Sequence, residues 1–166
     1  MSSALLPEDI ESLARRVVDE NRAANRKVVL AESCTGGLVA AALTEIPGSS
    51  AVLDRGFVTY SNEAKQESLG VPLEIIETFG AVSIACAWAM AKGALERSHA
   101  DIAVAISGVA GPDGGTDLKP VGTVVFARVV RGTESEPEGE LKLFEPISRA
   151  SIRREATLCA LDLLLP

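Results

Sequence analysis

Apolar residues at helical intervals occupy the start of the chain. Ile10, Leu13 and Val17 are three or four residues apart and follow Pro7, a residue type favoured in the first turn of a helix. This spacing places the apolar side chains on one helix face. We therefore expect a helix over residues 8–24 that covers one side of a sheet.

Helix and strand patterns alternate over the first two thirds of the chain, and a Gly- and Pro-rich loop at 108–122 precedes a predicted hairpin. Further helices are expected over residues 35–46, 63–69, 72–78, 83–97 and 148–165. Strands are expected over residues 27–31, 51–60, 101–106, 123–130 and 141–144. This order predicts the α/β class, as a three-layer sandwich with a mixed β-sheet between helices, in a single domain of residues 1–166.

The charge balance argues against a nucleic-acid partner. The chain carries 16 Lys and Arg against 23 Asp and Glu, a formal net charge of −7, whereas phosphate backbones favour clusters of basic residues. Arg149, Arg153 and Arg154 form a late basic cluster at helical spacing. A solvated helix face or a helix-end partner explains such a cluster, and an anion contact is the alternative.

Cysteine usage indicates a reducing compartment. The chain has three widely separated cysteines, Cys34, Cys86 and Cys159, without the spacing of a zinc site or a disulfide framework. Acidic residues stand where a signal peptide needs basic and then apolar ones, and the late apolar run at 158–165 is short and contains Asp162. We expect a soluble, cytoplasmic protein with no membrane partner.

A strand-to-helix junction at residues 28–37 is the first candidate site. An apolar run ends at Ser33, and a predicted helix follows at once. The first turn of a helix leaves backbone N–H groups unpaired and carries positive partial charge, so a serine there can act as a nucleophile beside donors for an oxyanion. Simple N-capping by Ser33 or Thr35 is the alternative.

A second candidate lies where a predicted strand ends at Tyr60 and the next helical turn brings Lys65 nearby. A serine nucleophile needs a proton acceptor, and a desolvated lysine, or a tyrosine held by lysine, supplies one where histidine is missing. The only histidine, His99, suits a surface or capping position, which argues against a Ser-His-Asp triad. Solvated positions for Tyr60 and Lys65 are the alternative.

A glycine-dense loop follows the apolar strand at 101–106. Glycines let backbone N–H groups approach an anion closely, and this loop matches neither a P-loop nor a dinucleotide fingerprint. We expect substrate contacts from Ser107, Gly108, Gly111, Gly114 and Gly115, with a plain tight connection as the alternative. No spacing among Glu32, Asp54, Asp113 and Asp117 requires a metal ion, so magnesium dependence is the weaker interpretation.

Taken together, five ordered segments resemble the CinA C-terminal domain family, which contains nicotinamide-nucleotide amidohydrolases. The segments are residues 31–37 (AESCTGG), 48–50 (GSS), 55–65 (RGFVTYSNEAK), 80–83 (GAVS) and 107–115 (SGVAGPDGG). The resemblance runs from about residue 8 to the end of the chain. It predicts a stand-alone form of the domain, without the larger N-terminal domain that some members carry.

The resemblance implies hydrolysis of the carboxamide of nicotinamide mononucleotide to nicotinate mononucleotide and ammonia, with neither a metal nor an organic cofactor. The family's catalytic set falls on Ser33, Tyr60 and Lys65. In this hypothesis Ser33 attacks the carboxamide carbon, and Lys65, directly or through Tyr60, takes the proton. Backbone N–H groups from Cys34 through Gly36 hold the oxyanion, and the substrate-binding set includes Cys34, Thr35, Gly36 and Gly37. The resemblance also implies a homodimer or larger homo-oligomer, with its pocket near a subunit boundary.

The substrate phosphate is expected in the loop at 107–115, with the Ser49 and Ser50 hydroxyls, or an arginine of another subunit, as alternatives. Two other functions stay open. One is a non-catalytic module that binds a pyridine nucleotide, which an assay for ammonia release would separate from an enzyme. The other is an amidase or esterase for a related substrate on the same scaffold, because a catalytic set fixes the chemistry better than the substrate.

Overall fold

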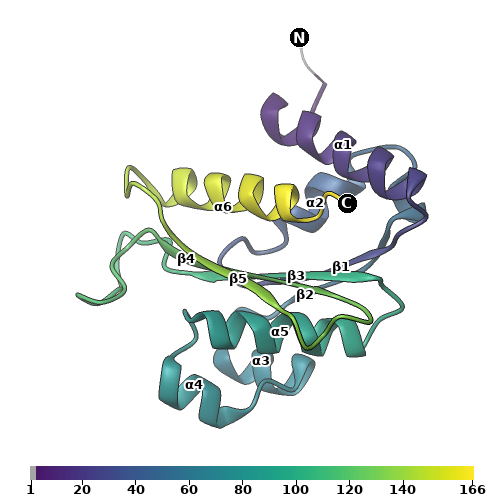
Figure 1. Ribbon diagram of the computed structural model, residues 1–166. Coiled ribbons are helices and arrows are strands. Elements are labelled where there is room, and N and C mark those ends of the chain that lie inside the picture. Colours follow the sequence, from purple (N-terminus) through teal and green to yellow (C-terminus); the bar gives the residue numbers. More distant parts are fainter. Residues whose placement is uncertain (1–2) are drawn as a thin grey trace.

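The computed structural model describes residues 3–166 and is built on one five-stranded sheet (Figure 1). The strands are β1 (Val28–Glu32), β2 (Leu53–Val58), β3 (Ile102–Gly108), β4 (Thr123–Val130) and β5 (Glu138–Leu143). They lie in the order β2-β1-β3-β4-β5. Strand β1 is parallel to β2 and β3, whereas β4 is antiparallel to both β3 and β5. The predicted mixed sheet is confirmed.

Helices cover both faces of this sheet, which completes the predicted three layers (Figure 1). One face carries α1 (Glu8–Ala23), α2 (Leu38–Thr44) and α6 (Arg149–Leu163). The other carries α3 (Asn62–Leu69), α4 (Leu73–Phe79) and α5 (Ile84–Glu96), and a short 3-10 helix, η1 (Ser49–Ala51), links α2 to β2. Within residues 3–166, no helix combines the length and apolar character needed to cross a membrane.

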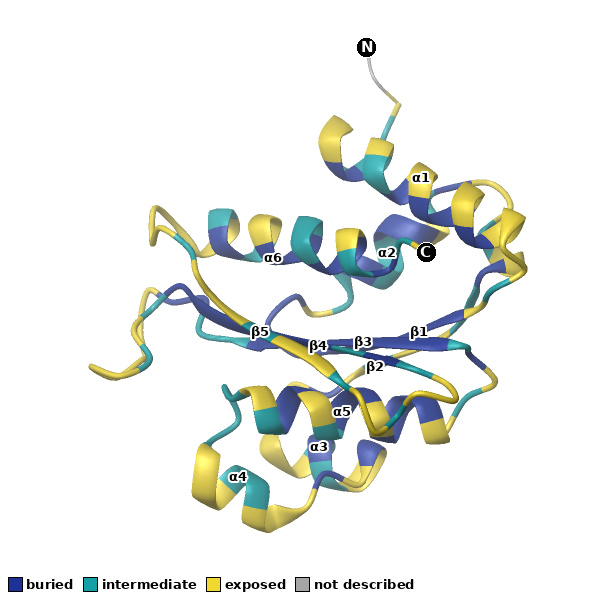
Figure 2. Ribbon diagram, viewed as in Figure 1, coloured by how far each residue is buried: buried dark blue, intermediate teal, exposed yellow. Residues whose placement is uncertain are grey.

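The central strands are buried on both sides (Figure 2). Because side chains alternate along a strand, Leu30 of β1 packs in the cluster that contains α1, α2 and α6, whereas Val29 and Ala31 pack in the cluster that contains α5. Phe126 of β4 joins the first cluster and meets Phe144 edge to face, with ring centroids 6.4 Å apart. Burial on both faces explains why these strands are continuously apolar in sequence.

The main departure from the predicted elements is the start of α2. The helix expected over residues 35–46 begins only at Leu38. Gly36 and Gly37 adopt φ angles of +62° and +100°, outside the right-handed helical region, so the chain makes turns between Ser33 and α2. The junction therefore presents a turn, and not a helix N-terminus, immediately after the candidate nucleophile.

A close approach of two helices determines where α3 lies. A Cβ atom at Gly93 on α5 would be 1.9 Å from the carbonyl oxygen of Leu69, the last residue of α3. Only glycine leaves room for this contact. Helix α3, which carries Lys65, therefore rests directly on α5 at the edge of the sheet where β1, β2 and β3 end.

Candidate functional site

The predicted nucleophile and base converge at the carboxyl ends of the parallel strands, where ligands bind in open α/β sheets. Ser33 directly follows β1, Ser107 lies near the end of β3, and Lys65 comes from α3. Ser61 caps α3, since its Oγ accepts a hydrogen bond from the Ala64 N–H at 3.0 Å. Ser33, Lys65 and Ser107 all line one cavity of about 250 Å³.

Lys65 reaches Ser33 directly. Its Nζ lies 3.1 Å from Ser33 Oγ, 2.9 Å from the carbonyl oxygen of Thr59 and 3.2 Å from that of Tyr60. The two carbonyl oxygens can accept two N–H bonds from the amine. The remaining position of the nitrogen then faces the serine hydroxyl.

The surroundings of Lys65 favour its neutral form. The residue is 1% exposed, and none of the ion pairs found among residues 3–166 involves it. Burial lowers the pKa of the Lys65 amine from its ordinary value of 10.5. A neutral amine has a free lone pair and can accept a proton from an alcohol.

One backbone N–H group beside Ser33 is available to a ligand, because Cys34 lines the cavity whereas Thr35 is 0% exposed and does not line it. Among the described residues, the N–H groups of Cys34 and Thr35 have no acceptor, whereas Gly36 donates to the Ser33 carbonyl at 2.9 Å. Burial raises the pKa of the Cys34 thiol to about 11, so the thiol stays protonated near neutral pH. Cys34 therefore offers its backbone, and not a thiolate, to the cavity. The predicted donor at Gly36 is already used inside the turn.

Glu32 caps α2 from the end of β1. Its buried carboxylate accepts hydrogen bonds from the Thr35 hydroxyl at 2.6 Å, the Val39 N–H at 3.0 Å and the Ala40 N–H at 3.1 Å. The first-turn N–H groups of α2 are thus used by the protein, which corrects the expectation that a helix N-terminus faces Ser33. The Thr35 side chain belongs to this cap, and Gly37 is the N-cap residue of α2.

Arg153 holds the same turn from the other side. Its Nε donates to the Cys34 carbonyl at 3.0 Å, and its Nη2 donates to the Thr35 carbonyl at 3.4 Å. The Cys34 carbonyl shares its peptide plane with the Thr35 N–H, and the Thr35 carbonyl shares its plane with the Gly36 N–H, so Arg153 orients these two N–H groups. The Cys34 N–H shares its plane with the Ser33 carbonyl, which accepts from the Gly36 N–H. Arg154, by contrast, pairs with Asp9 of α1.

Tyr60 lines the cavity, but its hydroxyl binds Arg149 and neither Lys65 nor Ser33. The hydroxyl accepts a hydrogen bond from Arg149 Nη2 at 2.9 Å, and the side chain is 61% exposed. Arg149 also donates to the Gly111 carbonyl at 2.7 Å. Neither contact joins the Tyr60 hydroxyl to Lys65 or Ser33, so the geometry favours direct proton transfer to Lys65 over a relay through Tyr60.

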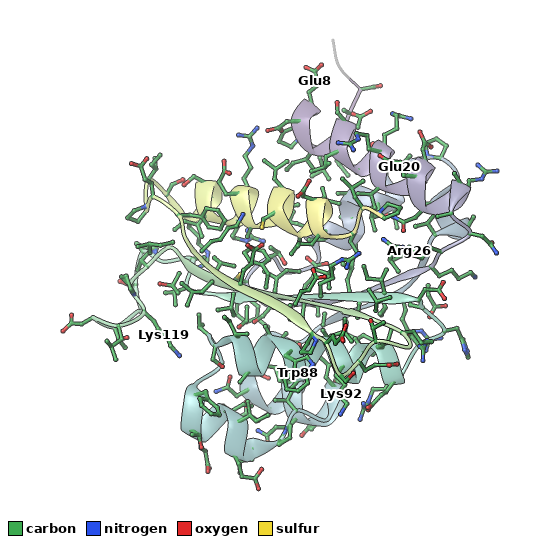
Figure 3. All side chains as sticks on the ribbon, in the orientation of Figure 1. Glu8, Glu20, Arg26, Trp88, Lys92 and Lys119 are labelled. Atoms are coloured by element: carbon green, nitrogen blue, oxygen red, sulfur yellow. The ribbon has the colours of Figure 1, made fainter. Side chains whose placement is uncertain are left out.

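The glycine-dense loop contributes only its first part to the cavity. Ser107, Gly108 and Gly111 line the cavity, together with Asp113. Gly114 and Gly115 do not line it. The loop between β3 and β4, which carries Lys119, projects away from the sheet (Figure 3).

Ser49 lies at the amino ends of the parallel strands, whereas Ser33 lies at their carboxyl ends. It belongs to η1, which precedes β2, and the neighbouring Val52 carbonyl accepts from the N–H of Val28 at the start of β1. A right-handed crossover through α2 returns the chain to the amino ends of the parallel strands. Within one chain, Ser49 therefore cannot share the pocket of Ser33, which corrects that expectation.

No group of three or more His, Cys, Asp and Glu side chains in the described part of the chain is arranged to hold a metal ion. Among the candidate acids, Glu32 is occupied as a helix cap and Asp54 accepts from Arg55 and from the His99 N–H. The cavity carries Lys65, Asp113 and Arg149 as its charged side chains. Its chemistry is that of a buried amine and alcohol.

A family model for the CinA C-terminal domain matches residues 10–166. The chain belongs to the CinA C-terminal domain family. The nicotinamide-nucleotide amidohydrolase PncC of Pseudomonas putida is 47% identical over 158 residues, which cover 95% of this chain and 96% of PncC. A CinA-like protein of Akkermansia muciniphila is 49% identical over 154 residues, which cover 93% of this chain but 36% of that protein. The CinA domain described here thus spans about a third of such longer relatives and nearly all of PncC.

Solved structures share the fold. The competence/damage inducible protein CihA of Agrobacterium tumefaciens superposes with a TM-score of 0.92 at 51% identity, covering 99% of this CinA domain and 97% of that chain. A CinA superfamily protein of Klebsiella pneumoniae superposes with a TM-score of 0.88 at 40% identity, covering 93% and 94% of the two chains.

Several residues of this CinA site were not predicted from sequence, among them Arg149 and Glu32. Arg149 reaches the cavity from the start of α6, although its charge cluster favoured a solvated helix face. Glu32 supports the turn after Ser33, whereas the sequence suggested no role for it other than metal ligation. The sequence does carry a sign of this role, since Glu32 ends an otherwise apolar strand. A carboxylate buried there needs hydrogen-bond partners.

Proposed function

We propose that this CinA domain hydrolyses the carboxamide of nicotinamide mononucleotide to nicotinate mononucleotide and ammonia, with Ser33 as nucleophile and Lys65 as base. The observation that carries the proposal is the 3.1 Å separation between Lys65 Nζ and Ser33 Oγ in a buried pocket. The relative PncC, a nicotinamide-nucleotide amidohydrolase matched over nearly its whole length, supports the choice of substrate.

The reaction begins with a neutral Lys65. The Thr59 and Tyr60 carbonyls accept its two N–H bonds, so its lone pair is directed at the Ser33 hydroxyl. Ser33 Oγ attacks the carboxamide carbon as its proton moves to Lys65 Nζ, and the lysine then protonates the departing ammonia. Water hydrolyses the resulting ester, releasing nicotinate mononucleotide and regenerating Ser33.

The oxyanion that forms during attack is held by the free N–H group of Cys34, which lines the cavity. Each such donor is worth about two to three powers of ten in rate when it is pre-oriented. The Gly36 N–H orients this donor, because it binds the Ser33 carbonyl in the same peptide plane. Arg153 and Glu32 hold the rest of the turn through the Cys34 carbonyl and the Thr35 hydroxyl.

Opposite charges at the cavity suit a zwitterionic nucleotide. Arg149 offers a guanidinium for the phosphate, and its bonds to Tyr60 and Gly111 hold it at the cavity. Asp113 offers a negative charge for the pyridinium ring. The early part of the glycine loop, at Ser107 and Gly108, lets the substrate approach the backbone closely.

The proposal includes a cytoplasmic setting and a homo-oligomeric state. The cysteines Cys34, Cys86 and Cys159 are all unpaired, as expected of a protein in a reducing compartment. No cofactor is invoked in the mechanism, because the amine, the alcohol and the backbone donor supply each step.

The test is ammonia release from nicotinamide mononucleotide, with the riboside and free nicotinamide assayed beside it. Ser33→Ala should lower turnover by at least about a thousandfold, the scale on which loss of a nucleophile acts. Ser49→Ala is the matched control, because this serine lies at the amino ends of the parallel strands and its variant should keep full activity. Hydroxylamine should trap the ester as a hydroxamate in the wild type and not in Ser33→Ala. Normal turnover by Ser33→Ala refutes the mechanism, and saturable binding without ammonia release by the wild type refutes the enzyme.

A further inference from the structure

Tyr60 presents an aromatic ring to the cavity. Among the described residues it is the only aromatic one that lines the cavity, and its side chain is 61% exposed. Within residues 3–166, the Tyr60 ring neither pairs with another ring nor has a cation over its face. Aromatic side chains gain from contacts on their faces, so an uncovered ring at a cavity is a candidate for a ligand contact.

The Tyr60 side chain extends from the reacting groups to Arg149. Its carbonyl oxygen accepts a hydrogen bond from Lys65 Nζ at 3.2 Å, and its hydroxyl accepts one from Arg149 Nη2 at 2.9 Å. Arg149 is held in turn by the Gly111 carbonyl at 2.7 Å. Because the guanidinium binds the hydroxyl at the edge of the ring, this contact fixes the ring and leaves its faces uncovered.

A substrate bound as in the proposed function runs alongside this side chain. Its carboxamide lies at Ser33 and Lys65, and its phosphate lies at Arg149. The pyridine ring is bonded directly to the carboxamide and lies between these two ends, next to the Tyr60 ring that spans them. In nicotinamide mononucleotide the ring nitrogen is bonded to the ribose and carries a positive charge, and the face of a tyrosine ring attracts cations.

The charges of the cavity also favour a positively charged ring. Burial lowers the pKa of Lys65 and favours its neutral form, and Arg149 is bound to Tyr60 and Gly111. Of the described residues, Asp113 is the one carboxylate that lines the cavity. Asp113 belongs to the loop after β3, whereas Tyr60 follows β2, so two different segments attract a cationic ring.

We propose that the Tyr60 ring stacks on the pyridinium ring and makes the site specific for oxidised, positively charged pyridine nucleotides. The inference rests on the proposed function, from which it takes the orientation of the substrate. A reduced, dihydropyridine nucleotide has the same carboxamide, ribose and phosphate but an uncharged ring. It therefore keeps its contacts with Ser33, Lys65 and Arg149 and loses the attraction to the Tyr60 face and to Asp113. Tyr60 is thus a specificity-determining residue, and not part of a proton relay.

The test is the ratio of two dissociation constants, that of reduced nicotinamide mononucleotide divided by that of the oxidised form. Both are measured by isothermal titration calorimetry in Ser33→Ala, in which the proposed nucleophile is removed and neither nucleotide should be turned over. Adding Tyr60→Leu removes the aromatic face and keeps an apolar side chain. A cation over a tyrosine face is worth about 2- to 30-fold in affinity, so Tyr60→Leu should lower the ratio by a factor in that range.

Tyr60→Phe in the same background is the matched control. Phenylalanine keeps the aromatic face and loses only the hydroxyl that Arg149 binds, so it should affect both nucleotides alike and leave the ratio nearly unchanged. Asp113→Asn removes the other attraction and should lower the ratio with either tyrosine or leucine at position 60. Thermal midpoints report whether each variant is folded, and the Tyr60 variants should be nearly unchanged because this side chain is mostly exposed.

The proposal is overturned if Tyr60→Leu leaves the ratio unchanged, if Tyr60→Phe lowers it as much as Tyr60→Leu does, or if Ser33→Ala binds neither nucleotide. Ammonia release by the wild type separates these results from the proposed function. An unchanged ratio beside normal ammonia release would remove the stacking role and leave the amidohydrolase standing. A ratio that falls in Tyr60→Leu, beside a wild type that releases no ammonia, would support the stacking role and contradict hydrolysis.

Discussion

Replacing Lys65 by methionine removes the amine while keeping an unbranched side chain of similar length. Nζ contacts only Ser33 Oγ and two backbone carbonyls, so the loss should fall on kcat and leave KM nearly unchanged. A general base in this position contributes about a hundredfold to ten-thousandfold. We expect Lys65→Met to lower kcat by a factor within that range.

The pH dependence of the wild type follows from the lowered pKa of Lys65. An amine with the ordinary pKa of 10.5 is neutral in only about one molecule in 3,000 at pH 7, and each unit of lowering raises that fraction about tenfold. Because the neutral amine is the base, the rate should rise with pH as one proton is lost. It should level off at a pH below 10.5.

The same pKa shift affects stability, with a sign that can be stated. Between the lowered pKa of folded Lys65 and the ordinary value of 10.5, the unfolded chain binds more protons than the folded one. The free energy of unfolding should therefore rise with pH across this window, and Lys65→Met should lack that rise. Urea unfolding at several pH values measures it.

The assay compares kcat for ammonia release from about pH 6 to about pH 10 in the wild type, Lys65→Met and Lys65→Arg. Arginine keeps the charge but does not lose its proton, so Lys65→Arg should be as inactive as the methionine variant. Wild-type kcat in Lys65→Met, or an unchanged rising limb in its residual activity, would refute the reasoning.

Three further substitutions probe the supporting groups. Glu32→Gln replaces one accepting oxygen by a donor and leaves a first-turn N–H of α2 unpaired, so it should lower the free energy of unfolding by about 1–3 kcal/mol in urea titrations; unchanged stability would contradict the capping role. Arg149→Met should raise KM for nicotinamide mononucleotide about 10- to 100-fold and leave that for the riboside nearly unchanged, and equal effects on both would exclude a phosphate contact. Tyr60→Phe removes the hydroxyl that Arg149 binds and should change KM more than kcat, whereas a large fall in kcat would revive a proton relay through this residue.

The sequence predicted the layers of the fold because they depend on local patterns. Apolar periodicity placed the helices on the sheet, and the end of an apolar strand placed Ser33 at the edge where ligands bind. The link between Ser33 and Lys65 spans 32 positions, and only the resemblance to a family joined them. The mixed order of the strands then brought α3 over the end of β1.

What the sequence did not predict depends on contacts between distant elements. Arg149 meets Tyr60 across 89 positions, and a helical charge pattern carries no information on which surface lies opposite. The late start of α2 resulted from two positive φ angles and a cap supplied by the preceding strand. The position of Ser49 relative to the site depends on the crossover through α2, which carries the chain to the amino ends of the parallel strands and which no local pattern encodes.

Gly93, which does not line the cavity, controls the position of Lys65, the base in the proposed mechanism. A single methyl group there would collide with the last carbonyl of α3 and push the whole helix outward, carrying Lys65 away from the alcohol it serves. Engineers who randomise this scaffold to widen its range of amides should hold that codon fixed. The distance between Lys65 Nζ and Ser33 Oγ therefore depends on the absence of a side chain at Gly93 as well as on the residues that line the cavity.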